Sequence, residues 1–368
     1  MNDTIFIHSF MRSSSTYFAM KFRTPETVLF FEPYNSFLKD CTIASIKKYD
    51  YSTWDSHHSM SAPYFIEYEP FLNKGKGVKL FSTDFHFKNY FSLQISPEEY
   101  NYLQQFIKHS WSQQKKPCFG FIESSCRAPL LLKSFGGIHI CQYRNPINVL
   151  HSIFSYPFQS TFFPEYMNNL SSDHRKMLDI STEYNQPAIF LSNSLIKNFF
   201  KLWIISTTTA ALYSHIIINI DQMENPLYQD QIKNSIKTLS SLDLNFKDCT
   251  NKKYNNCLPL EPMIETFEFF FESDLKINTF IQKIESMYAT PSLLGRKEFI
   301  AILEDIEKSL RNTNFSYKDY CLFYEKNTHI IENFINEKFK TDITTLKASK
   351  SYKLAKILQK LYHYIIPK

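Results

Sequence analysis

A turn near the amino terminus combines an arginine with four consecutive hydroxyl residues. It follows a short apolar run at residues 5–7 and precedes an apolar segment at residues 17–22. Its members are Arg12, Ser13, Ser14, Ser15 and Thr16. Backbone amides and hydroxyl groups at a strand-to-helix turn can converge on an anion, and the guanidinium adds a full positive charge. The pattern predicts a phosphate- or sulfate-binding loop, and a serine-rich helix cap beside a surface arginine would give the same residues.

A second basic turn follows a later apolar run, at residues 138–143. It begins with Arg144-Asn145-Pro146, and Ser152 lies eight residues after the arginine. Proline favours the first turn of a helix, so we expect Ser152 on a helix that begins there. Ligands of open α/β sheets bind at the carboxyl ends of the strands, and a guanidinium with a hydroxyl group can hold phosphate. The alternative interpretation is an ordinary loop whose arginine is paired with a carboxylate.

Six short apolar runs, mostly of β-branched and aromatic residues, divide the first 220 residues and predict buried strands. They comprise residues 5–7, 28–31, 78–81, 118–122, 138–143 and 216–220. Segments with helical spacing separate them, most clearly residues 98–112 and 198–213. This alternation predicts an α/β fold with a P-loop-like central parallel sheet that is flanked by helices.

The last third of the chain differs, because helical spacing continues there without strand-like runs. Residues 298–310 and 320–339 show this spacing most clearly. We therefore expect three parts, which are a nucleotide-binding core over 1–260, a helical cap or subdomain over 261–346 and a basic amphipathic helix over 347–368. Such a terminal helix can lie on an anionic membrane, although docking on its own domain is the simpler interpretation.

The composition is that of a globular chain, with 368 residues, 43% of them hydrophobic and 21% charged. A formal net charge of +5 requires no nucleic-acid partner but would help an anionic substrate to approach. The sequence shows neither a membrane-spanning apolar run nor the features of a signal peptide, so we expect a cytoplasmic protein, with a secreted effector as the alternative. The seven cysteines lack zinc-binding spacing, and we expect free thiols; Cys249 and Cys257 are the pair that could form a disulfide.

Taken together, the two basic turns resemble the nucleotide-binding motifs of sulfotransferases, the enzymes that use 3′-phosphoadenosine 5′-phosphosulfate (PAPS). The first turn is similar to their 5′-phosphosulfate loop, and Arg144 with Ser152 is similar to their 3′-phosphate motif. Glu32-Pro33, at the end of the second apolar run, resembles the catalytic glutamate of the protein-tyrosine and many bacterial branches; some branches act on carbohydrates. Later matches, which extend the resemblance over about residues 4–245, are Trp203, Asp221-Gln222-Met223 and Asn225-Pro226.

The resemblance implies a sulfuryl transfer from PAPS to a hydroxyl of a carbohydrate, a protein tyrosine or a small molecule, without a metal. It makes Glu32 the base that takes the proton from the acceptor hydroxyl. It makes Arg12 the residue that stabilises charge on the leaving phosphate. Residues 13–16 would hold the 5′-phosphosulfate, and Arg144 with Ser152 the 3′-phosphate. Tyr17 would stack on the adenine, although it could equally be a core aromatic.

Two departures from the family pattern bear on activity. Ser14 stands where the family has glycine, a residue that adopts positive φ without strain. The segment Glu123-Ser124-Ser125 lacks a lysine motif of some members, and Arg127 could supply the missing charge. The main alternative is therefore a non-catalytic, sulfotransferase-like protein that binds nucleotide or a partner. A nucleotide phosphotransferase is a weaker alternative, because both glycines and the lysine of a Walker A motif are missing.

Histidines are competing candidates for the base. His57-His58 lies in a polar stretch, and Asp84 lies two residues before His86. Asp55 with His58 could begin a metal site, but the sequence offers no further ligands in a recognisable spacing. Glu32 remains the expected base.

Overall fold

A computed structural model describes residues 3–48, 63–122, 124–154, 166–180, 193–246 and 260–311. Its centre is a parallel sheet of five strands in the order β2-β3-β1-β4-β5. The strands are β1 (Ile5–Ser9), β2 (Thr27–Phe31), β3 (Lys116–Phe121), β4 (Ile138–Tyr143) and β5 (Ile216–Asn219). Their residues are buried almost throughout, as expected for a parallel sheet that is covered on both faces.

Helices surround this sheet and make up all regular structure after β5 in the described residues. The α-helices are α1 (Ser15–Met20), α2 (Ile43–Lys48), α3 (Phe87–Tyr90), α4 (Pro97–Ser112), α5 (Ala128–Phe135), α6 (Pro146–Phe154), α8 (Ser172–Met177), α9 (Asn193–Leu212), α10 (Pro226–Ser240), α11 (Glu261–Phe271), α12 (Asp274–Tyr288) and α13 (Arg296–Arg311). Short 3₁₀ helices are η1 (Ser36–Lys39), η3 (Ile66–Phe71), η4 (Thr83–Phe85), η5 (Ser125–Arg127) and η7 (Ile220–Gln222). The α/β fold with a helical carboxyl-terminal region is thus confirmed.

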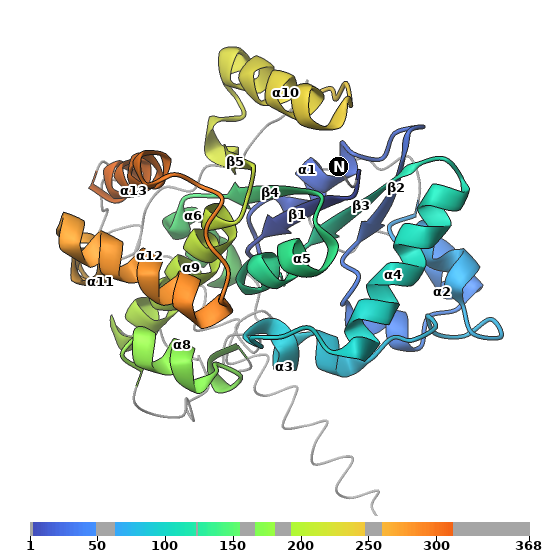
Figure 1. The fold of residues 1–368 in the computed structure, drawn as a ribbon, viewed down its shortest axis with the longest axis horizontal. Coiled ribbons are helices and arrows are strands. Elements are labelled where there is room, and N and C mark those ends of the chain that lie inside the picture. The colour runs from blue at the N-terminus through green and yellow to red at the C-terminus, as the bar shows by residue number, and fades with distance from the viewer. Residues whose placement is uncertain are drawn as a thin grey trace, which may run out of the picture.

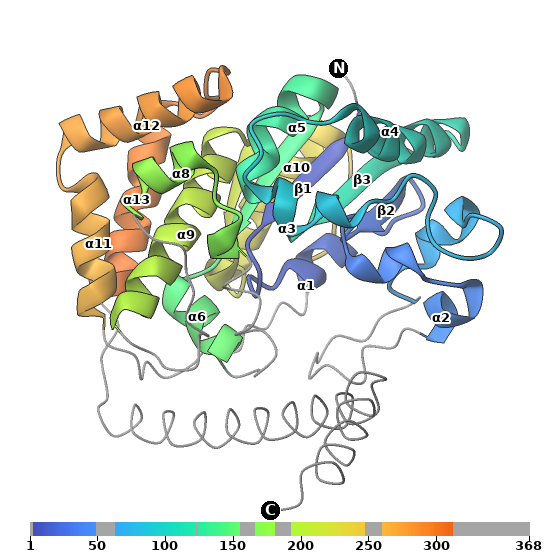
Figure 2. The ribbon, with the colours of Figure 1, turned by 90° about the horizontal axis from the view of Figure 1, so that it is seen from below.

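The two faces of the sheet carry different helices. Phe119 of β3 packs with Phe106 of α4, whereas the next residue, Gly120, faces α1. A Cβ at Gly120 would lie 2.9 Å from the Cβ of Ala19 and 2.4 Å from the Phe31 ring, so glycine allows α1 to approach. Figures 1 and 2 agree that α5 lies on one side of the strands and α1 on the other.

The carboxyl-terminal helices α11, α12 and α13 gather on the β4–β5 side of the molecule, opposite α2 and α4 (Figure 1). They share one apolar cluster with α9 and with the end of β4. Trp203, fully buried in α9, stacks on Phe200 within this cluster. The described part of the expected helical cap, residues 261–311, therefore packs directly on the layer that covers the sheet. The expected helices over 320–339 and 347–368 lie outside the described residues.

One predicted strand is wrong. Residues 78–81 do not join the sheet, and Val78 makes only an isolated antiparallel bridge with Leu72. Leu80 has a φ of 62° and is largely exposed. This segment is a turn because Gly77 also has positive φ and packs too closely on the Lys39 carbonyl for a side chain. The predicted helices over 98–112, 198–213 and 298–310 match α4, α9 and α13.

Candidate anion-binding site at the carboxyl edge of the sheet

The loop after β1 contains two residues other than glycine in left-handed backbone conformations. Ser14, which replaces the glycine of the motif, has φ 58° and ψ 29° and directly precedes α1. Arg12 also has a positive φ, of 62°. These left-handed conformations are unfavourable for residues that carry a Cβ. Serine therefore takes the conformation that glycine would adopt freely, and the loop keeps its shape. Ser15 and Thr16 form the first turn of α1, which spans only six residues.

Two buried polar atoms at the base of this loop lack a hydrogen-bond partner among the described residues, namely Ser13 Oγ and Gln142 Oε1. Gln142 belongs to β4, and its side-chain amide donates to the Ser13 carbonyl. Buried polar groups in proteins are nearly always paired, and exceptions often mark a place for a ligand or water. The hydroxyl of Ser13 is therefore a polar group that is buried beneath the loop and unpaired within the described part of the chain.

The two sequence motifs meet through a direct hydrogen bond. Arg12 Nε donates to Ser152 Oγ at 2.8 Å, although 140 positions separate them in the chain. Ser152 lies on α6, whose first residue is Pro146, as expected, and its side chain is buried. The parallel sheet explains the meeting, because β1 and β4 are neighbours and both basic turns leave from their carboxyl ends.

Arg144 leaves the end of β4 and is paired with a carboxylate. Its Nε lies 3.3 Å from Asp221 Oδ1, and the arginine side chain is 6% exposed. Asp221 follows β5 and also accepts from the backbone amide of Asn145 at 2.7 Å and from the side chain of Asn148 at 3.4 Å. This is the pairing of the arginine with a carboxylate that the alternative interpretation of the turn expects. Asp221 fixes the guanidinium and, at the same time, offsets part of its positive charge.

Glu32 lies at the same edge, directly after β2. Its backbone has a φ of 45°, and its amide donates to the Gly120 carbonyl at 2.7 Å. The carboxylate is 9% exposed and accepts from the Tyr64 hydroxyl at 2.6 Å and from the Asn35 side chain. A glutamate in a strained conformation, almost fully buried and held by two donors, is typical of a functional carboxylate.

Two further tyrosines hold the backbone on either side of Glu32, and a third, Tyr34, follows it closely in the chain and is held by a carboxylate. Tyr68 donates to the carbonyl of Phe31 at 3.0 Å, and Tyr102 to that of Pro33 at 2.5 Å. Tyr34 donates to Glu99 Oε1 at 2.5 Å. All three rings are fully buried, and burial raises each phenol pKa well above its ordinary value. The hydroxyls therefore remain protonated donors, and they fix the turn that carries Glu32.

Two predicted residues have other roles in the structure. Arg127 does not reach the anion-binding loop, because its buried guanidinium is paired with Glu99 and the Asn89 carbonyl. It is therefore a structural ion pair. Tyr17, a residue of α1, packs in the apolar core. Its hydroxyl lies 3.4 Å from the Phe246 carbonyl, and the Lys21 ammonium lies 4.6 Å from its ring centre. These contacts match the core-aromatic interpretation.

Sequence reasoning missed a buried chain of hydrogen bonds that runs from Ser124, after β3, across β1 to the amino end of β4. Ser124 Oγ lies 2.7 Å from His8 Nδ1, and His8 Nε2 lies 2.9 Å from His139 Nδ1. His139 Nε2 lies 3.0 Å from the Gly136 carbonyl, which can only accept. In the neutral chain each histidine therefore carries its proton on Nε2, and Ser124 donates to His8. Burial lowers the pKa of His139 to about 3 and that of His8 well below its ordinary value.

Of the remaining candidates for the base or for a metal site, one has a clear partner among the described residues. Asp84 is paired with Lys88, at 2.7 Å. His57, His58, Asp55, Glu123, Cys249 and Cys257 lie outside the described residues. Four described cysteines are free and buried, and burial raises the pKa of the Cys126 thiol to about 12. No cluster of metal-binding side chains occurs in the part of the chain that the structure describes.

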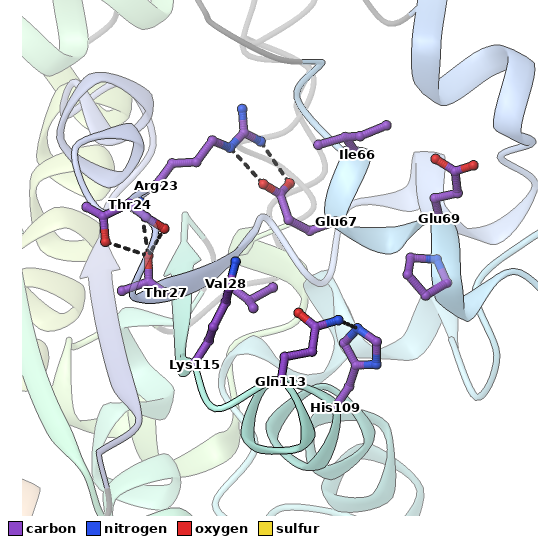
Figure 3. A pocket seen from close by; sticks show the side chains of 11 residues that line it. Arg23, Thr24, Thr27, Val28, Ile66, Glu67, Glu69, His109, Gln113 and Lys115 are labelled. Carbon is purple, nitrogen blue, oxygen red and sulfur yellow. Dashed lines mark hydrogen bonds and ion pairs between the residues drawn. The ribbon is translucent and has the colours of Figure 1, made fainter.

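A pocket of about 390 Å³ lies elsewhere, at the amino end of β2 and β3 (Figure 3). Its polar lining includes Arg23, Glu67, His109 and Lys115. Figure 3 shows Arg23 directed at Glu67, and the pair is 2.7 Å apart. This pocket is at the opposite end of the strands from Glu32 and Arg144, so it is not part of the carboxyl-edge site.

Comparisons with protein-family models, curated proteins and solved structures find no match to this chain. Within the described residues, none of the helices has the length and apolar character needed to span a membrane.

Proposed function

We propose that the protein is a PAPS-dependent sulfotransferase. The observation that carries this proposal is the position of Glu32, a buried and strained carboxylate at the same sheet edge as the anion-binding loop. The hydrogen bond between Arg12 and Ser152 supports it, since it joins the two turns that resemble the family's nucleotide-binding motifs. A base and an anion-binding site at one edge are what an in-line transfer to a hydroxyl requires.

In this proposal Glu32 takes the proton of the acceptor hydroxyl, which then attacks the sulfur of the sulfuryl group. The bond between sulfur and the 5′-phosphate oxygen breaks, and Arg12 stabilises the charge on the departing phosphate. Ser13 and the start of α1 supply donors for the 5′-phosphosulfate. Arg144, oriented by Asp221, and Ser152 hold the 3′-phosphate. Tyr64 and Asn35 keep the Glu32 carboxylate in place.

The first test is a calorimetric titration with the product nucleotide, 3′-phosphoadenosine 5′-phosphate (PAP), beside AMP and ATP. We expect tight binding of PAP alone and its loss in Arg144→Ala. Arg311→Ala is the matched control, because Arg311 is an exposed arginine on α13 that is paired with Glu307. Absence of PAP binding to the wild-type protein would overturn the proposal.

A non-catalytic, sulfotransferase-like protein that binds nucleotide or a partner is the second candidate, and Ser14 at the position of the family's glycine favours it. Serine holds the left-handed backbone there under strain, whereas glycine would adopt it freely. Transfer of radiolabelled sulfate from PAPS to a panel of phenols and sugars distinguishes the two. Turnover that is lost in Glu32→Gln, while PAP still binds, supports the enzyme; binding without turnover on any acceptor supports the second candidate.

A further inference from the structure

A carboxylate from the carboxyl-terminal helices binds the ends of two sheet strands. Asp305 of α13 accepts from the Tyr143 hydroxyl and from the Asn219 side chain, both at 2.7 Å to Oδ2. Its Oδ1 accepts from the Gln222 side chain at 3.3 Å. Tyr143 is the last residue of β4 and Asn219 the last of β5. One side chain of α13 thus contacts the ends of the two strands that lead directly into Arg144 and Asp221.

Two short routes lead from Asp305 to the Arg144 guanidinium. The first is covalent, because Tyr143 directly precedes Arg144. The second passes through Asn219, whose side-chain oxygen accepts from the Asp221 amide at 3.0 Å. Asp221 in turn accepts from Arg144 Nε at 3.3 Å. A displacement of Asp305 would therefore reach both the arginine and the carboxylate that orients it.

The chemistry of this contact requires a carboxylate. Asp305 receives three donors on two oxygens, whereas an asparagine has a single acceptor oxygen and two donor hydrogens. Tyr143 and Asn219 are both buried, so a lost partner leaves a polar group unpaired at the strand end. Burial, then Asp305, raises the pKa of Tyr143 well above its ordinary value, so the phenol remains a donor.

We propose that Asp305 is a positioning residue that sets Arg144 for the 3′-phosphate, so that α13 contributes to the preference for a 3′-phosphorylated nucleotide. This inference rests on the proposed function. It predicts that loss of the Asp305 carboxylate weakens PAP binding, whereas simple electrostatics predicts the opposite change in affinity. Removal of a negative charge near an anion site should strengthen binding if Asp305 acts only as a charge. Removal of a positioning group should weaken it.

The test compares Asp305→Asn with Glu304→Gln, a neutralised exposed neighbour on the same helix. We expect PAP to bind Asp305→Asn about tenfold more weakly, as for the loss of one well-made hydrogen bond to a charged group. AMP, which lacks the 3′-phosphate, should bind both variants and the wild type equally. Equal weakening of PAP and AMP would overturn the proposal, and so would tighter binding of PAP to Asp305→Asn.

A ligand-free readout separates this proposal from the proposed function. The side-chain Nε–H resonance of Arg144 in ¹⁵N-arginine-labelled protein, assigned with Arg144→Lys, reports the guanidinium directly. We expect it to shift in Asp305→Asn and to stay in place in Glu304→Gln. If the resonance shifts in Asp305→Asn but the wild type does not bind PAP, the proposed function is overturned and the coupling between Asp305 and Arg144 stands. An unmoved resonance would overturn the positioning role itself.

Discussion

The buried histidines predict that acid destabilises the protein well before its carboxylates are protonated. Burial lowers the pKa of His139 to about 3 and that of His174 to about 4, and it lowers that of His8 well below 6.5. In the unfolded chain each has a pKa of about 6.5. Below pH 6.5 these histidines are therefore protonated in the unfolded state, whereas they remain neutral in the folded state. Stability is complete above pH 6.5 and falls as the pH drops toward the folded-state values.

The expected loss is large relative to total stability. With pKa values of about 3 folded and about 6.5 unfolded, His139 contributes a loss of about 2 kcal/mol at pH 5. His174 contributes a similar amount, so these two histidines together reach roughly 4 kcal/mol, and the lowered pKa of His8 adds to the loss in the same direction. Domains are typically stable by about 5–15 kcal/mol. We therefore expect a steep loss of stability between pH 7 and pH 5.

The assay is chemical unfolding at pH 7 and pH 5, followed by circular dichroism. His139→Gln removes one titrating group. The free energy of unfolding that this variant loses between pH 7 and pH 5 should therefore be about 2 kcal/mol smaller than the loss in the wild type. Ser124→Ala is the matched control, because it breaks the same chain but removes no titrating group. It should lower stability equally at both pH values. A pH dependence of His139→Gln equal to that of the wild type would refute the reasoning.

Three further predictions concern single residues. Tyr64→Phe should lower kcat in a PAPS turnover assay and leave PAP affinity unchanged, because the Tyr64 hydroxyl contacts the Glu32 carboxylate. Tyr68→Phe should affect kcat less, because the Tyr68 hydroxyl contacts a backbone carbonyl. Equal effects on kcat would contradict the role of Tyr64. Ser14→Gly should raise the free energy of unfolding by about 1 kcal/mol in denaturant titrations, since it relieves a left-handed conformation, and an unchanged midpoint would contradict this. Gly120→Ala should lower that free energy by about 1–3 kcal/mol, because its Cβ meets the Phe31 ring, and a neutral effect would show that α1 can move aside.

The sequence predicted the two basic turns and Glu32 at one edge, because parallel strands bring their carboxyl ends together. Glu32 and Arg144 directly follow a short apolar run, and Arg12 follows one within five residues, so a local pattern was sufficient. The sequence also marked Ser14 as standing where the resembling family has glycine, and its φ is positive. The false strand over 78–81 shares the apolar letters of the true strands. It is not a strand because Gly77 and Leu80 have left-handed backbone conformations, and the hydrophobic pattern does not indicate backbone conformation.

Contacts between distant residues could not be predicted in the same way. His8 and His139 are 131 positions apart, and each is a lone histidine in a strand-like run. They meet because β1 and β4 pair in a register that places both on the same face. The pairing of Arg144 with Asp221 likewise depends on β5 lying beside β4. Such contacts follow from strand order, which a single sequence does not specify.

The left-handed backbone at the site has a consequence for the order in which the molecule opens. Arg12, Ser14 and Glu32 all have positive φ although none is glycine. Their conformations are opposed by their own preferences and are maintained by the surrounding strands, carbonyls and tyrosine hydroxyls. Once those contacts loosen, the turns can relax to conformations that their residues prefer without any opening of the sheet. On mild heating, ligand binding should therefore disappear before the helical signal does.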